Sequence, residues 1–142
     1  MPMVGFGTFL NNGDECEKSV CQAIQAGYRL IDTAEAYGNE KEVGKGIQLS
    51  GIDRKELFIV TKVNFKSYEN TRETVLNSLK NLQVDYLDMV LLHWPYGNTY
   101  HAYRELEKMY EEGLIRSIGI SNYQDSQYID LIHFNKIVPV LN

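Results

Sequence analysis

Four side chains that can take part in proton transfer lie close behind three apolar runs of this sequence. Asp32 follows the first run directly and Tyr37 comes five residues later, while Lys62 and His93 each end a run of their own. A fourth run ends in the polar pair Ser121-Asn122. If these runs are parallel strands of one sheet, their carboxyl ends share one edge. The acid, the phenol, the ammonium and the imidazole are therefore expected at one mouth.

This set of groups suits the delivery of a proton to oxygen. A free phenol, with a pKa of about 10, is a poor acid near neutral pH, but a neighbouring ammonium favours its ionised form. A carboxylate can hold that ammonium, and an imidazole N–H can orient a carbonyl oxygen. None of these groups donates a hydride, so a reduction needs a cofactor. The structural alternatives are a rim ion pair for Lys62 and Asp32, a packing role for Tyr37 and a hydrogen-bonded core position for His93.

The elements that must position these residues alternate between short apolar runs and amphipathic segments. We expect parallel strands near residues 4–7, 28–31, 57–61, 86–92 and 115–120. Helices are expected over Asp14–Ala26, Glu40–Gln48, Thr71–Leu82, Tyr100–Glu112 and Ser126–Phe134, and a sixth strand begins at Val138.

Local signals mark the ends of several of these helices. Gly27 and Gly113 stand where a helix-terminating glycine belongs. Asn39, with Glu42 three residues later, predicts a capping side chain at the start of the second helix. Gly44 and Gly46 lower the helix propensity of that segment, which is therefore expected to be short and weak.

Strict alternation predicts an α/β fold with a parallel sheet and one domain over residues 1–142. Gly5-x-Gly7 lacks the third glycine and the following helix of a dinucleotide-binding turn, which argues against an open doubly wound sheet. Functional candidates at four successive strand ends favour a (β/α)8 TIM-barrel type instead. The chain supplies about five and a half β/α units of such a barrel.

Composition narrows the partners and the compartment. The chain is 44% hydrophobic and 23% charged, with a formal net charge of −5, which argues against nucleic acid or an anionic membrane as a partner. No apolar run approaches the roughly 20 residues that span a bilayer, and the start has no secretory pattern. We therefore expect a cytoplasmic protein. Cys16 and Cys21 show no metal-binding spacing, so no metal is expected and both thiols should be reduced.

The motifs that contain these residues resemble those of the aldo-keto reductase family. They occur in family order, cover essentially the whole chain and are of the bacterial type. The matching stretches are Gly5-Phe6-Gly7-Thr8, Asp32-Thr33-Ala34-x-x-Tyr37-Gly38-Asn39-Glu40, Thr61-Lys62, Leu92-His93-Trp94-Pro95 and Gly113-x-Ile115-Arg116-Ser117-Ile118-Gly119-Ile120-Ser121-Asn122-Tyr123.

The resemblance implies a barrel that reduces aldehydes and ketones with NADPH rather than NADH. By position, Tyr37 would be the general acid, Lys62 and Asp32 its tuning pair, and His93 the residue that orients the carbonyl. The resemblance places the cofactor at Gly7, Thr8, Asp32, Ser121 and Asn122. It places the small carbonyl substrate, whose identity stays open, at Phe9 and Trp94; many family members have a tryptophan at the position of Phe9.

Family barrels are longer than 142 residues, and many of the residues with which they bind the cofactor correspond to positions after Asn142. The alternative to an enzyme is therefore a truncated, non-catalytic half-barrel that acts as a binding or assembly module. If 142 residues were the whole molecule, inward residues such as Val60, Val90 and Leu92 should be exposed. Open sheet edges would then favour self-association, and NADPH would bind poorly.

Overall fold

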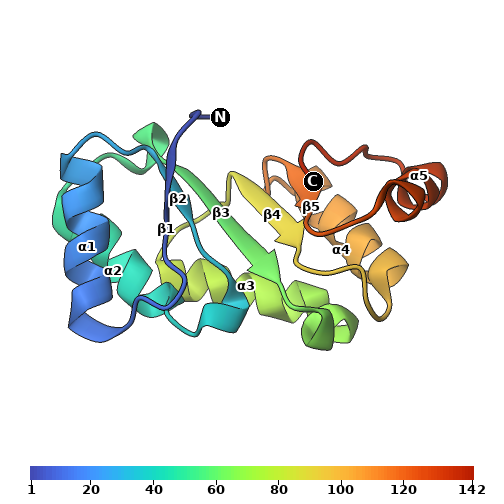
Figure 1. The fold of residues 1–142 in the computed structure, drawn as a ribbon, viewed down its shortest axis with the longest axis horizontal. Helices are drawn as coiled ribbons and strands as arrows, with labels where there is room; N and C mark the ends of the chain where they lie inside the picture. The colour runs from blue at the N-terminus through green and yellow to red at the C-terminus, as the bar shows by residue number, and fades with distance from the viewer.

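The structure, a computed structural model that describes all of residues 1–142, is built on one curved five-stranded sheet (Figure 1). Every neighbouring pair of strands is parallel, and the strands lie in the order in which they occur in the chain. The strands are β1 (Gly5–Gly7), β2 (Leu30–Asp32), β3 (Phe58–Val63), β4 (Met89–Leu92) and β5 (Ile118–Ile120). The predicted parallel strands are thus confirmed, although most of them are shorter than expected.

The predicted helices are also present, each in the connection between two strands or after the last strand. They are α1 (Gly13–Gln25), α2 (Glu40–Ser50), α3 (Thr71–Leu82), α4 (Thr99–Glu111) and α5 (Asp125–Phe134), with short 3-10 helices η1 (Glu35–Tyr37), η2 (Arg54–Glu56) and η3 (Phe65–Asn70). Gly27 and Gly113 follow α1 and α4 with positive φ angles of 103° and 81°, as expected at helix ends. None of the helices combines the length and the apolar character needed to cross a membrane.

The segment expected to begin a sixth strand lies beside β5. The backbone N–H of Val140 donates to the carbonyl of Ile118 at 3.0 Å, and the N–H of Ile120 donates to that of Leu141 at 2.9 Å. These two bonds align the segment with β5, but they do not extend into a regular strand.

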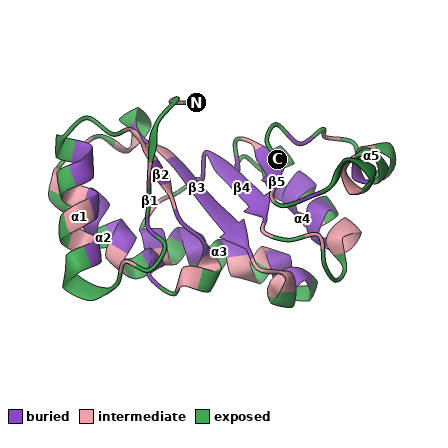
Figure 2. Ribbon diagram, viewed as in Figure 1, coloured by how far each residue is buried: buried purple, intermediate pink, exposed green.

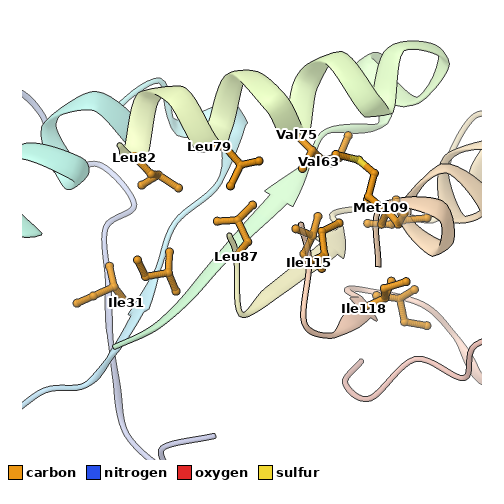
Figure 3. Packing of buried hydrophobic residues seen from close by; sticks show 14 of the residues in the cluster. Ile31, Val63, Val75, Leu79, Leu82, Leu87, Met109, Ile115 and Ile118 are labelled. Carbon is orange, nitrogen blue, oxygen red and sulfur yellow. The ribbon is translucent and has the colours of Figure 1, made fainter. Parts of the chain in front are cut away.

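The main core lies between the helices and one face of the sheet. Figure 3 shows Val75, Leu79 and Leu82 on the side of α3 that points toward the strands, close to Leu87. Met109 of α4 belongs to the same cluster. The strands β3, β4 and β5 are accordingly buried along most of their length, whereas β1 and β2 are more exposed (Figure 2).

The expectation that Val60, Val90 and Leu92 would be exposed is wrong. Val90 and Leu92 are fully buried, because strand alternation turns them toward the helices, where they join the main core. Val60 is on the opposite face, where Met89 and Leu91 of the neighbouring strand cover it in a second, smaller cluster. The partly buried side chains of Leu30 and Phe58 pack against this cluster and help to cover it.

The two glycines of α2 allow close packing rather than a weak helix. A Cβ atom on Gly44 would lie 2.7 Å from the carbonyl oxygens of Asn81 and Leu82 in α3. A Cβ atom on Gly46 would lie 2.7 Å from the carbonyl oxygen of Glu17 in α1. The helix therefore forms over its full 11 residues because it is packed between two neighbours.

Candidate active site

A partly buried ion pair lies at the centre of the site. The Lys62 Nζ donates hydrogen bonds to both carboxylate oxygens of Asp32 at 2.8 Å and to the carbonyl of Thr33 at 2.9 Å. The lysine side chain is only 9% exposed, whereas that of Asp32 is 37% exposed. An ammonium this deeply buried needs such partners, since taking a charge out of water costs several kcal/mol.

Tyr37 brings its phenol to this pair from a turn rather than from a strand. Its hydroxyl oxygen lies 3.5 Å from the Lys62 Nζ, at the outer limit of a hydrogen bond, and the Nζ is 5.2 Å from the ring centre. The expectation that Asp32, Tyr37 and Lys62 meet at one mouth, with the carboxylate holding the ammonium, is confirmed. The ammonium is therefore placed to stabilise negative charge on the phenol oxygen.

His93 follows β4 and faces the phenol edge-on. The ring centres of His93 and Tyr37 are 6.0 Å apart. The pKa of His93 lies below its usual value, first because burial disfavours the imidazolium and second because Lys62 repels it. The Nδ1 atom of His93 is buried without a hydrogen-bond partner. An unpaired buried acceptor is less unusual than an unpaired buried N–H, which favours a neutral ring protonated on Nε2.

Aromatic side chains border these residues. Phe9 is 65% exposed and its ring centre lies 5.0 Å from that of Tyr37. Trp94 stacks against both His93 and Tyr96, with ring centres 5.9 and 6.1 Å apart. Sequence analysis missed Tyr96, although its place two residues after Trp94 was a usable signal. The border offers flat apolar surface beside the polar groups.

The polar pair after β5 lies beside the end of β4. Asn122 adopts a left-handed backbone with φ of 65°, and its side-chain amide donates to the carbonyl of His93 and to the Ser121 hydroxyl, both at 3.0 Å. Of the residues expected near β1, Gly7 is exposed, whereas Thr8 is fully buried and donates to the Thr33 hydroxyl. Thr8 thus lies beneath the surface formed by the other residues.

Asn39 has a different task from the predicted one. It does occupy the position before α2, but its side chain makes no capping hydrogen bond. Its amide nitrogen donates to the carbonyls of Thr8 and Asn11, both at 2.7 Å, and its oxygen accepts from the Thr33 hydroxyl. The interpretation as a side-chain cap is therefore wrong, because the buried amide is turned toward the loop after β1.

A buried carboxyl group ties the start of α2 to β3. The Thr61 hydroxyl donates to Glu40 Oε1 at 2.7 Å, directly before Lys62 in the chain. The pKa of Glu40 is raised, chiefly by burial, although hydrogen bonds from Thr61, Ser78 and Asn81 oppose that shift. Sequence analysis assigned no role to Glu40, since nothing local to the motif indicates which strand its carboxyl group reaches.

Comparison with known proteins gives one family over almost the whole chain. The profile of the Aldo/keto reductase family matches residues 3–142. The chain is 47% identical to glyoxal reductase of Bacillus subtilis over 146 residues and 40% identical to methylglyoxal reductase DkgA of Escherichia coli over 145 residues. In both comparisons all of this chain is covered but only 53% of the relative, so the chain spans about half the length of these relatives.

Solved structures agree with this result. An aldo/keto reductase from Brucella melitensis superposes with a TM-score of 0.96 at 41% identity, covering 100% of this chain and 56% of that one. An aldo-keto reductase from Bombyx mori in complex with NADP gives a TM-score of 0.93 at 32% identity, covering 99% of this chain and 53% of that one. The fold class is that of the (β/α)8 barrel, of which the chain forms five strands. On both sequence and structure, the chain belongs to the aldo-keto reductase family.

Proposed function

We propose that the protein containing this chain reduces aldehydes and ketones to alcohols, with Tyr37 as the general acid. The observation that carries this proposal is the buried Lys62 ammonium, held by Asp32 and placed 3.5 Å from the Tyr37 hydroxyl. A lysine–carboxylate pair made only for stability would not require a phenol within reach of the ammonium. The named reductases among its relatives support the same reaction class.

The chain's own residues have distinct tasks in this reaction. The Tyr37 hydroxyl gives its proton to the carbonyl oxygen, and Lys62 stabilises the phenolate that remains. Asp32 keeps the ammonium in place through its two hydrogen bonds. The neutral His93, protonated on Nε2, donates a hydrogen bond that orients the carbonyl oxygen toward the phenol. A bound reduced nicotinamide supplies the two electrons that none of these groups can provide.

The residues after β5 fit the carboxamide of such a cofactor. The Asn122 side-chain nitrogen is committed to His93 and Ser121, whereas its oxygen accepts no hydrogen bond within the chain. That oxygen and the Ser121 hydroxyl can pair with the N–H and carbonyl groups of a carboxamide. We propose NADPH rather than NADH, in keeping with the NADP complex of the Bombyx mori relative. At the opposite edge of the sheet, Gly7 of β1 offers exposed backbone beside Asp32, and the buried Thr8 would act only through the loop that it anchors.

The substrate we propose is a small carbonyl compound bound against Phe9 and Trp94. The relatives named for glyoxal and methylglyoxal make these two compounds the first substrates to test. The proposal includes a cytoplasmic location, which fits two cysteines that remain free thiols.

The substitution Tyr37→Phe tests the assignment of the proton donor. In the intact protein, we expect methylglyoxal-dependent NADPH oxidation to fall by about a hundredfold or more, because the proton donor is lost, while NADPH affinity stays unchanged. Tyr110→Phe, at an exposed position on α4, is the matched control and should retain full activity. A Tyr37→Phe rate near that of the unsubstituted protein would assign the proton to another group. NADPH binding without turnover by the unsubstituted protein would instead support the binding-module alternative.

A further inference from the structure

The side chain of Glu35 connects the turn that carries Tyr37 to the loop that follows Lys62. Its Oε2 atom accepts a hydrogen bond from the backbone N–H of Asn64 at 3.0 Å, and its Oε1 atom accepts one from the Ser67 hydroxyl at 2.7 Å. Asn64 comes directly after β3, and Ser67 lies in η3. One half-buried carboxylate therefore joins the segments that hold the phenol and the ammonium.

The turn itself has few hydrogen bonds of its own. Tyr37 ends the three-residue helix η1, which has only two backbone bonds of its own, from Tyr37 N–H to Ala34 and from Gly38 N–H to Glu35. Short 3-10 helices have poor hydrogen-bond geometry and low stability. Asn39 ties the same segment to the loop after β1. Glu35 is thus the side chain within η1 that links the turn to the segment after β3, while Thr33 before the turn and Glu40 after it are bonded to β3 itself.

The contacts of Glu35 indicate that it positions other residues and does not itself take part in proton transfer. Both carboxylate oxygens are already hydrogen-bonded to the neighbouring loop. Its charge raises the pKa of His93, but this is the smallest of the effects on that residue, behind burial, Lys62 and Asp32. Glu35 forms no hydrogen bond or ion pair with the Tyr37 phenol or the Lys62 ammonium, whose partners are each other, Asp32 and Thr33. Its influence on the reaction must therefore act through the place of the turn.

We propose that Glu35 is a positioning residue that fixes the Tyr37 phenol relative to the Lys62 ammonium, an inference that rests on the proposed function. The bidentate carboxylate spans the two connections, after β2 and after β3, that together define the distance between proton donor and cation. Loss of the link lets the turn move away from Lys62. Proton transfer then slows, while the surfaces that bind cofactor and substrate remain.

The test compares Glu35→Ala with Glu35→Gln in the intact protein. Glutamine can keep both links, since its oxygen accepts from Asn64 N–H and its nitrogen donates to the Ser67 hydroxyl, which can also accept. We expect Glu35→Ala to lower kcat for methylglyoxal by roughly tenfold to a hundredfold, the cost of a misplacement of about 1 Å, with KM and NADPH affinity nearly unchanged. Glu35→Gln should restore most of kcat. Ser67→Ala, which removes one of the two links, should give a smaller fall.

The matched control is Glu69→Ala. Glu69 is an exposed carboxylate in the neighbouring η3 that also links two connections, through a 3.2 Å bond from the Asn98 side chain, but it does not touch the turn of Tyr37. Its loss should leave kcat unchanged.

Three outcomes separate the alternatives. Normal kcat in Glu35→Ala, when Tyr37→Phe abolishes turnover, overturns the positioning role and leaves the proposed function standing. Full turnover in Tyr37→Phe overturns the proposed function itself. A folded Glu35→Gln protein as slow as Glu35→Ala overturns the positioning role as well, because the charge rather than the link would then matter.

Discussion

Replacing Gly44 by alanine should destabilise the protein, although alanine is the better helix former. The added methyl carbon would lie 2.7 Å from two backbone carbonyl oxygens of α3, those of Asn81 and Leu82, about 0.7 Å short of the 3.4 Å at which ordinary contact begins. Backbone carbonyls cannot rotate away as a side chain would, so α2 and α3 must separate. Overpacking costs about 1–3 kcal/mol, and a clash with two backbone atoms belongs in the upper part of that range, at about 2–3 kcal/mol. The higher helix propensity of alanine offsets about 1 kcal/mol of this cost.

We therefore expect a net loss of about 1–2 kcal/mol, which lowers the melting temperature by roughly 2–8 °C, at about 2–4 °C per kcal/mol for a protein of this size or larger. Thermal unfolding followed by circular dichroism measures this, with Lys41→Ala on the exposed side of the same helix as the control. A Gly44→Ala protein that melts at or above the temperature of the unsubstituted protein would refute the close approach of the two helices.

Two further predictions concern the site. Lys62→Met should lower kcat by about a hundredfold to ten-thousandfold, because the phenol loses the cation that stabilises its ionised form. The rate of NADPH oxidation measures this effect. A rate within threefold of normal would argue against the ion pair as the activating group. The lowered pKa of His93 means that the unfolded chain binds a proton there more readily than the folded chain. Stability to urea should accordingly fall as the pH drops below about 6.5, and His93→Gln should reduce this slope; an unchanged slope would contradict the buried, neutral histidine.

The strands and helices were predictable because their signals are local. Apolar runs, amphipathic spacing and the glycines at positions 27 and 113 each act within a few residues. The same local logic placed Asp32, Lys62 and His93 together, since each directly ends a strand and parallel strands end at one edge. Tyr37 required only that the connection after β2 be short.

Contacts that depend on the path of loops were not predictable from the sequence. The targets of Asn39 and Glu35 lie on other connections, and no pattern near either residue identifies them. Gly44 permits close packing of α2 because the backbone of α3 lies directly beside it, and the sequence does not show how near α3 comes. Helix propensity alone therefore predicted a weak helix. The expected exposure of Val90 failed because burial depends on which face of the strand a residue takes. Self-association through open edges stays a prediction.

The neighbour-by-neighbour order of the strands has a consequence for how the fold forms. Each strand pairs with the one before it in the chain, so every pairing closes a loop of about one β/α unit. The entropy cost of closing a loop grows only slowly with its length, so no single pairing is much harder than the others. A chain leaving the ribosome can therefore add one unit at a time from its N-terminus. Asp32 and Tyr37 would then be in place before β3 pairs with β2. Lys62 would form its ion pair with Asp32 when β3 is added. The hydrogen bond from Asn122 to His93 would form last, after β5 has paired with β4.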